Sequence, residues 1–464
     1  MTLNLNADIT QLKGADYNPR RIDEKAIETL CESIKRLGIV KPLIARGTTL
    51  VAGHQRTKAL LKIGVKTAPV YFLGTDANLV DEIQFNQLHN GTDMDSGDEN
   101  AWITGLDLKP GYQVVDSQSV RYNLDCSMAV VRNSICNLIT KFGPWGAVVA
   151  TDEGQIIHAA QYAISAKLTS TPLTVFVIPA ARKPEYLQFL TKQYGVFSYE
   201  HLPRETFVQS WAQMLRLRNT ENGFRVSKTY EQLVIPWLKN NPRARVLDFG
   251  CGQGDYVNAL SRHGVNIIGI EFYRRKAGAS VIDLKAVHAM IDAAIESMRL
   301  HGPFDAVVCD SVLNSVDSMK AERDVLNTLD ALCKPNGVIF FSGRTRESLD
   351  RLYKSSHMAP RRVGNKVEFI DENGFTGRFR KGSWFYQKYH SKAQIAEIIS
   401  SRGWIKIKER PRDGAWSVQV TRPRPTVPRI ELLQSVADEF NILMNSKGEC
   451  LGRAKDVLKV LNWL

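Results

Sequence analysis

The chain has 464 residues, and its 61 lysines and arginines outnumber 48 aspartates and glutamates, giving a formal net charge of +13 at pH 7. No stretch reaches the ~18 uninterrupted apolar residues of a membrane span, and the first residues lack the basic and apolar parts of a signal peptide. The seven cysteines are scattered without a Cys-x-x-Cys pair, which argues against a zinc site or a disulfide framework and favours a reducing cytoplasm.

Residues 17–73 contain the first predicted elements. After Tyr17-Asn18-Pro19-Arg20, the pattern predicts a helix at 27–37, strands at 42–46 and 50–52, a second helix from Gly53 and a last strand at 68–72. The order Asn-Pro-Arg, helix, Gly-x-x-x-Pro-Leu and Gly-His-x-Arg resembles the N-terminal domain of ParB-type partition proteins. That domain shares its outline with sulfiredoxin.

The resemblance implies that the turn at Gly53 engages an anion. Gly53 frees the backbone N–H groups of a helix start, and His54, Arg56 and Arg20 are the candidate side chains for nucleic acid or a nucleotide such as CTP. An ordinary salt bridge is the alternative for Arg56. The turn lacks the cysteine of sulfiredoxins, which excludes that chemistry. Residues 85–90 lack the arginine of a CTP-binding element, so CTP binding stays open.

A weaker copy of this order follows. Strands at 146–151 and 155–158, a helix from 159 and an apolar strand at 172–178 repeat the arrangement of residues 38–73. Gln161 then takes the place of Gln55 and Tyr162 that of Arg56, so the copy lacks the arginine. We predict a ParB-like domain at 1–95 and an α/β domain at 100–218, which is either a degenerate second ParB-like lobe or an unassigned fold.

The run of residues 245–255 predicts a buried strand that ends in an acid and opens into a glycine-rich turn. Asp248 precedes three alternating glycines, which allow a sharp turn and the close approach of a ligand: Gly250, Gly252 and Gly254. A second apolar strand ends at Glu271, whose carboxylate can accept both hydroxyls of a ribose. A nicotinamide or flavin dinucleotide is the competing ligand, but an acid before the first glycine would repel its pyrophosphate.

This pattern resembles a class I S-adenosylmethionine-dependent methyltransferase, and the likeness extends over residues 225–422. Residues 304–310 match the family's fourth strand and 332–341 its fifth. The resemblance implies that S-adenosylmethionine binds through Asp248, Gly250, Gly252, Gly254, Glu271 and Asp310. The predicted fold class is therefore α/β and multidomain. ParB-like α+β modules are followed by a Rossmann-like methyltransferase sheet over 222–425 and a helical C-terminal segment over 426–464.

The acceptor is expected at the carboxyl end of the fourth strand, where Asp310, Ser311 and Asn314 are the candidate catalytic residues. Asp310 can act as a base for an acidic acceptor or orient the cofactor amine, and the sequence does not separate these roles. The site lacks the Pro-Pro-Tyr motif of methylases that act on exocyclic amines of bases, and the chain has no Pro-Cys pair for cytosine-carbon chemistry. We expect Cys309 to be a buried strand residue and not a nucleophile.

Positive charge is concentrated late in the chain. Residues 340–430 hold 20 lysines and arginines against 8 aspartates and glutamates, with aromatic residues between them. Such a mixture suits a phosphate backbone and unstacked bases, and the candidate contacts are Arg378, Arg380, Lys381 and Trp384. A solvated sheet edge is the alternative. After a proline-rich spacer, two helical patterns predict a hairpin packed on the core or a small DNA-reading module.

These features favour a cytoplasmic methyltransferase that acts on nucleic acid, with DNA as the first choice, in which the ParB-like module engages nucleic acid or a nucleotide. A phage or plasmid origin would suit this pairing of domains. One alternative is a partition-like or regulatory DNA-binding protein whose methyltransferase fold senses the cofactor or acts as a scaffold. A further alternative is an RNA or small-molecule methyltransferase. The sequence implies no membrane partner and leaves the oligomeric state undetermined.

Overall fold

The structure is a computed structural model that describes residues 2–18, 20–74, 76–91, 101–123, 129–190, 196–197, 219–220, 223–224, 226–276, 281–347, 373–380, 383–412, 414–423, 426–444 and 449–462. The chain forms two compact units. The first contains residues 1–198 with 350–372 and 376–382, and the second contains residues 199–349, 373–375 and 383–464. Among the described residues, no helix is long and apolar enough to cross a membrane.

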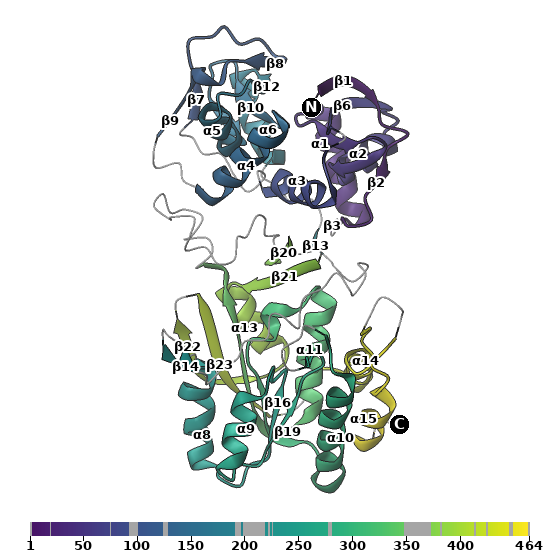
Figure 1. Ribbon diagram of the computed structural model, residues 1–464, viewed down its shortest axis with the longest axis vertical. Coiled ribbons are helices and arrows are strands. Elements are labelled where there is room, and N and C mark those ends of the chain that lie inside the picture. Colours follow the sequence, from purple (N-terminus) through teal and green to yellow (C-terminus); the bar gives the residue numbers. More distant parts are fainter. Residues whose placement is uncertain are drawn as a thin grey trace. The chain divides into compact units, whose positions relative to one another are not determined.

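The first lobe of unit one is a mixed sheet with the strand order β1-β6-β4-β5-β2, covered by helices (Figure 1). Its elements are β1 (Thr2–Asp8), β2 (Lys13–Gly14), β3 (Arg20–Arg21), α1 (Glu24–Leu37), β4 (Leu43–Arg46), β5 (Thr49–Ala52), α2 (His54–Lys62), β6 (Thr67–Phe72) and α3 (Leu79–Gly91). Asp23 caps α1 by accepting the Ala26 N–H, and Gly38 ends it with a φ of 75°. The buried face of α1 is Ile27, Leu30, Ile34 and Leu37, as the helical spacing predicts.

The second lobe is a four-stranded sheet with the order β11-β10-β12-β8. Its elements are β7 (Ala101–Ile103), β8 (Gly111–Val115), β9 (Val120–Tyr122), α4 (Ala129–Phe142), β10 (Ala147–Thr151), β11 (Ile156–His158), α5 (Ala160–Leu168), β12 (Leu173–Ile178) and α6 (Lys183–Leu190). The short strand β13 (Val196–Phe197) pairs with β3 of the first lobe. In the second lobe, β10, β11, α5 and β12 follow one another in the same strand–strand–helix–strand order as β4, β5, α2 and β6 in the first.

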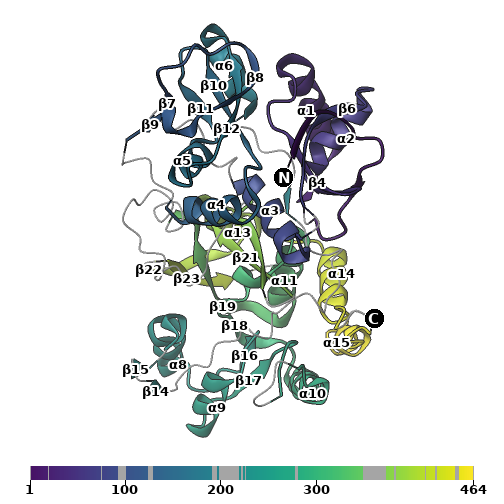
Figure 2. The ribbon, with the colours of Figure 1, turned by 45° about the horizontal axis from the view of Figure 1, so that its top comes forward.

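Unit two is built on a largely parallel sheet, and Figure 2 shows β17, β16, β18 and β19 side by side within it. These strands are β16 (Val246–Phe249), β17 (Ile267–Ile270), β18 (Phe304–Cys309) and β19 (Cys333–Thr345). The antiparallel strand β23 (Ala415–Arg422) adds to β19, and β22 (Ile405–Arg412) adds to β23. Buried aliphatic residues of β16 and β18 form its core, as parallel strands covered on both faces require.

Helices and a further hairpin complete unit two. The helices are α8 (Ile235–Asn240), α9 (Asp255–Arg262), α10 (Leu284–His301), α11 (Met319–Leu332), α13 (Lys392–Ser401), α14 (Arg429–Glu439) and α15 (Ala454–Val460). The remaining strands are β14 (Asn219–Thr220), β15 (Gly223–Phe224) and the hairpin strands β20 (Phe375–Arg380) and β21 (Ser383–His390); residues 376–380 of β20 are grouped with unit one. β21 runs parallel to the end of β19, with Tyr389 opposite Arg344. This hairpin lies between the fifth and the final strands in the sequence.

The C-terminal helices pack on the core of unit two. Ser435 of α14 bonds to Asn327 and Asp324 of α11, and the Arg453 guanidinium before α15 pairs with Asp292 of α10. Of the two predicted arrangements, the structure has the packed hairpin. α14 ends at Glu439, earlier than the helical pattern predicts. The chain then turns through Asn441, and its backbone returns at Leu451 to bond to Ile442.

Candidate cofactor and acceptor site

The glycine turn after β16 is fixed by backbone bonds to β17. The N–H groups of Gly250 and Cys251 donate to the Ile270 carbonyl, 2.8 and 3.1 Å away. Gly250 has a φ of 81°, and a Cβ there would overlap the Val312 side chain. Glycine is therefore required by conformation and by space. The loop after β18, which carries Val312, packs directly on the turn.

Glu271 holds the turn from the end of β17. Its carboxylate, in a residue only 7 % exposed, accepts the N–H of Gly252 at 2.8 Å and that of Tyr273 at 2.9 Å. The Arg274 guanidinium donates to the Gly252 carbonyl at 3.0 Å. A carboxylate oxygen can accept more than one hydrogen bond, so a carboxylate at this position suits ribose hydroxyls.

Asp248 lies at the base of the same turn and is almost fully buried. Its carboxylate accepts the Tyr230 hydroxyl at 2.6 Å, and the Tyr230 ring stacks on Tyr256 of α9 with centroids 4.2 Å apart. Burial and the negative charge of Asp248 raise the pKa of Tyr230 well above its usual value. The phenol therefore stays protonated and donates to the carboxylate.

Asp310 follows β18 and is held by hydroxyl groups from distant segments. Its Oδ1 accepts Thr229 at 2.8 Å and Ser342 at 2.7 Å, and its Oδ2 accepts Ser227 at 2.6 Å. Thr229 also bonds to Ser417 of β23, 2.9 Å away. Such bonds stabilise the ionised carboxylate and fix its orientation. This geometry suits a carboxylate that orients a ligand better than one that must take up a proton.

Ser311 and Asn314 lie in the loop that faces β21. Ser311 has a φ of 64°, and its N–H donates to Ser342 Oγ at 2.8 Å. Asn314, 8 % exposed, donates from Nδ2 towards Ser315 at 3.4 Å, and its buried Oδ1 has no hydrogen-bond partner within the described residues. A buried oxygen that accepts no hydrogen bond costs free energy. An N–H or O–H group of a bound methyl-acceptor molecule would supply the missing hydrogen bond.

A buried charged cluster, formed by Glu322, Lys388 and His390, joins α11 to β21 beside this loop. Glu322 pairs with the Lys388 ammonium and with His390 Nε2, which is 2.5 Å away, and each of the three is at most 4 % exposed. Burial alone would raise the pKa of Glu322, but the hydrogen bond from His390 and the two partner charges lower it to about 2. Burial lowers the pKa of His390. The cluster therefore fastens β21 to α11.

Both cysteines of the site are inert as placed. Cys309 is fully buried in β18, and burial raises its pKa well above the usual value, as it also does for Cys251 in the glycine turn. A buried protonated thiol is a poor nucleophile. Cys309 is therefore a strand residue, as predicted.

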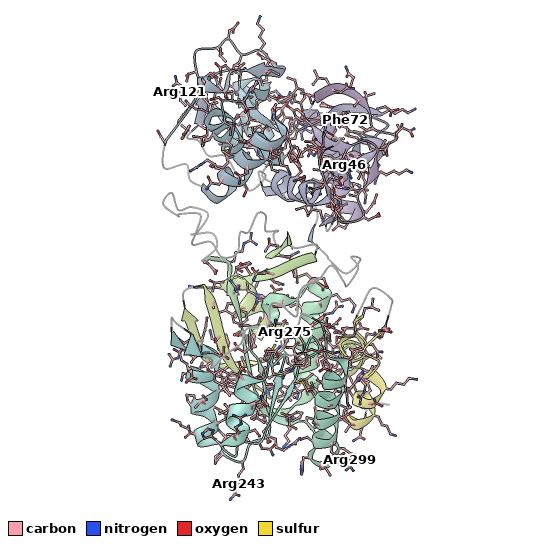
Figure 3. The ribbon with its side chains drawn as sticks, in the orientation of Figure 1. Arg46, Phe72, Arg121, Arg243, Arg275 and Arg299 are labelled. Atoms are coloured by element: carbon pink, nitrogen blue, oxygen red, sulfur yellow. The ribbon has the colours of Figure 1, made fainter. Side chains whose placement is uncertain are left out.

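The basic stretch at 340–430 is less available than its charge suggests. Lys388 pairs with Glu322, and both Arg402 and Arg422 bond to Asp330 at 3.2 and 3.0 Å, all of them buried. Glu322 and Asp330 lie on α11, outside residues 340–430, so a count of charges within that stretch did not include the carboxylates that neutralise these cations. The side chains of Arg378, Arg380, Lys381 and Trp384 lie outside the described residues. Elsewhere on unit two, Arg243 and Arg299 project outward (Figure 3).

The turn of the first lobe has the expected backbone form. Gly53 has a φ of 94° and precedes α2. His54 Nε2 accepts the Ala15 N–H at 3.1 Å, and the Arg56 guanidinium donates to the Lys41 carbonyl at 2.5 Å. The backbone of Arg20 lies in β3, and its side chain is outside the described residues. Arg56 therefore makes at least one bond to the backbone of the segment before β4.

The equivalent turn of the second lobe is closed by a tyrosine. The Tyr162 hydroxyl accepts the N–H groups of Trp145 and Gly146, each at 2.9 Å, and its ring covers Gly146 so closely that a Cβ would overlap it. Ala159 replaces Gly53 and still has a φ of 63°. The side chain of Tyr162 thus fills the place that Arg56 has in the first lobe.

Sequence reasoning missed Ser227, Thr229 and Tyr230. They precede β16 and hold Asp310 and Asp248 through hydroxyl groups. No local pattern marks them. The short π-helical turn at Tyr230–Val234 appears only in the structure, and such turns are frequent at functional sites.

The parallel sheet, the glycine turn, and the acids at the carboxyl ends of β16, β17 and β18 define an S-adenosylmethionine-dependent methyltransferase domain. The residues fit that cofactor, because the turn accepts no side chain at Gly250 and is surrounded by carboxylates, which suit an amine and ribose hydroxyls and not a pyrophosphate. The family model described as a methyltransferase domain matches residues 223–385, and that of the ParB N-terminal domain matches residues 3–85. The chain carries both domains.

Curated relatives match part of the chain. The ubiquinone biosynthesis O-methyltransferase of Erwinia tasmaniensis is 28% identical over 28% of this chain and 55% of its own length. That of Ralstonia nicotianae is 32% identical over 24% of this chain and 48% of its own length. The chain thus spans about half the length of these relatives. Among solved structures, the PH0226 protein of Pyrococcus horikoshii is 18% identical over 42% of this chain and 88% of its own, with a TM-score of 0.29.

Proposed function

We propose that the whole protein transfers a methyl group from S-adenosylmethionine to an acceptor bound beside the loop after β18. The observation that supports this most is the position of Asp310. Its carboxylate is fixed by three hydroxyl groups, and its loop packs against the glycine turn through Val312. The turn, Glu271 and Asp310 would hold the cofactor, and the space beyond Asp310 would receive the acceptor.

The chemistry asks little of the protein beyond placement. The bound cofactor supplies an electrophilic methyl group on a sulfonium. The chain's residues must align the acceptor in line with it, which by itself is worth several kcal/mol of barrier. Asn314 Oδ1 is suited to receive an N–H or O–H of the acceptor. Asp310, whose orientation its hydroxyl partners fix, would orient the cofactor amine.

Nucleic acid, with DNA as the first choice, is our first candidate acceptor. The ParB N-terminal domain match and the net charge of +13 support it, since cations on the surface attract a phosphate backbone. In this proposal the first lobe engages nucleic acid or a nucleotide through Gly53, His54 and Arg56. The burial of Lys388, Arg402 and Arg422 reduces the support that the basic stretch gives.

A small hydroxylated molecule is the second candidate. The curated relatives are described as ubiquinone biosynthesis O-methyltransferases. A small acceptor would need no basic surface, which agrees with the buried cations near β21 and β23.

The test is an acceptor screen with methyl-labelled S-adenosylmethionine. Duplex DNA, RNA, and the small-molecule fraction of a bacterial lysate are incubated separately with the full chain and with an Asp310→Ala variant. Label in DNA that needs Asp310 supports the first candidate, and label in the small-molecule fraction supports the second. If no fraction gains label while the cofactor binds, the proposal of methyl transfer is wrong and the domain is a cofactor sensor.

A further inference from the structure

The two lobes of unit one have equivalent strands. Ile44 of β4 pairs antiparallel with Ala52 and parallel with Tyr71. Val149 of β10 pairs in the same two ways, with His158 and Phe176. In both lobes one more strand, β1 or β8, pairs antiparallel with the last strand. The strands β1, β4, β5 and β6 of the first sheet therefore have counterparts in β8, β10, β11 and β12 of the second.

The helices are equivalent as well. α1 and α4 each have 14 residues, and each is followed by a glycine with positive φ, Gly38 or Gly143. α3 follows the last strand of the first lobe, and α6 follows that of the second. Four pairs of counterparts result from these positions: Arg36 with Lys141, Leu37 with Phe142, Asp81 with Glu185, and Phe85 with Phe189.

These counterparts meet across the lobes in a reciprocal way. Asp81 of α3 pairs with Lys141 at the end of α4, 2.8 Å away. Its counterpart Glu185 of α6 pairs with Arg36 at the end of α1, 3.3 Å away. Each lobe thus places its last helix against the end of the other lobe's first helix, as α3 and α4 show in Figure 1. A two-fold axis produces this reciprocal arrangement, in which a residue of one lobe contacts a residue of the other and their counterparts make the same contact in reverse.

The apolar contacts repeat the exchange. The Phe85 ring lies 5.5 Å from that of Phe142, and Phe189 packs in one buried cluster with Leu37. All four side chains are at most 8 % exposed. The equivalent strands β6 and β12 also meet, because the Tyr71 and Thr174 hydroxyls are 2.7 Å apart. Elements near a two-fold axis are expected to meet their own counterparts.

We propose that unit one is a single-chain pseudo-dimer, in which the second lobe occupies the surface through which the first lobe would otherwise bind a second copy of itself. The second lobe is then a built-in partner. In the second lobe the Tyr162 side chain closes the turn, whereas the first lobe has Gly53 and Arg56 at the equivalent positions. The contacts that join the lobes are of the same kind on both sides: an ion pair, and an aromatic ring packed on the apolar end of a helix. The two turns, by contrast, differ in sequence.

Hydrogen exchange on the full chain tests the reciprocity. Phe85→Ala should speed exchange at least tenfold in α4 of the second lobe, and Phe189→Ala should do the same in α1 of the first. Leu79→Ala and Gln188→Ala, exposed positions on the same two helices, are the matched controls and should change these rates less than twofold. Amides of β18 in unit two serve as the internal reference.

The proposal is overturned if each phenylalanine variant speeds exchange only within its own lobe. Should the alanine variants fail to fold, Phe85→Leu and Phe189→Leu replace them with the same expected direction. A charge exchange gives a second measurement: Asp81→Lys alone should speed exchange in α4, and adding Lys141→Asp should restore the parent rate. A double variant no slower than the single variant would equally overturn the pairing.

Discussion

Replacement of Glu271 is the most direct test of the cofactor site. The residue is 7 % exposed at the end of β17, and its carboxylate accepts two backbone N–H groups of the turn. We expect Glu271→Ala to weaken the binding of S-adenosylmethionine, because the carboxylate that should accept the ribose hydroxyls is removed. The turn also loses the acceptor that fixes Gly252.

The size of the effect follows from these bonds. A hydrogen bond to a charged group contributes about 1.5–3 kcal/mol, so the loss of one ribose contact weakens binding about 10- to 150-fold. The freed N–H groups of Gly252 and Tyr273 would also lower the stability of the unliganded domain. Glu271→Gln keeps one acceptor oxygen with nearly the same volume and should therefore weaken binding less.

Titration calorimetry with S-adenosylmethionine measures these affinities, and thermal unfolding checks that each variant is folded. Glu296→Ala, which removes an exposed carboxylate from a surface pair with Arg299 on α10, is the control and should bind as the parent does. A folded Glu271→Ala protein whose Kd stays within twofold of the parent's would remove Glu271 from the site and refute the reasoning.

Three further outcomes are expected. The basic triplet is Arg378, Arg380 and Lys381. Changing all three to alanine should reduce the slope of log affinity for DNA against log salt concentration by about 2–3. An unaltered slope in gel shifts would make the region a solvated face. Arg56→Ala should weaken the binding of DNA or CTP and leave the affinity for S-adenosylmethionine unchanged. Lys58→Ala, an exposed position on the same helix, is the control. Loss of both affinities would indicate a composite site. Glu322 has a folded pKa of about 2 against a usual 4.5, so its stabilisation is complete above pH 4.5 and disappears as the pH falls towards 2. Urea unfolding should find that the stability gap between the parent and Glu322→Gln shrinks by about 3 kcal/mol over this interval, and a constant gap would contradict the buried ion pair.

Much of the cofactor turn was predictable because its requirements are local. Gly250 must adopt a positive φ beside Val312, and a strand must end in an acid at Asp248 and again at Glu271. The positive φ of Gly250 and the acid at the end of each apolar run are properties of single short segments, so they leave a pattern of glycines and acids that the sequence shows. The buried strands around them were predictable for the same reason, from continuous apolar runs.

The partners of these acids were not predictable. Tyr230 reaches Asp248, and Ser227, Thr229 and Ser342 reach Asp310 from two segments, one before β16 and one in β19. Serine, threonine and tyrosine are common on any surface, so their presence carries no signal until the fold brings the hydroxyl groups to a carboxylate.

The amino-acid sequence by itself determined the two kinds of domain, the glycine turns at Gly53 and Gly250, and the loss of the arginine at Tyr162. These are properties of backbone conformation and of single side chains. The tertiary structure alone decided which charges are exposed, since Lys388 and Arg422 are neutralised by carboxylates of α11 far away in the chain. It also decided the reciprocal pairing of the two lobes. Burial and pairing depend on distances between segments remote in sequence, and those distances exist only once the chain has folded.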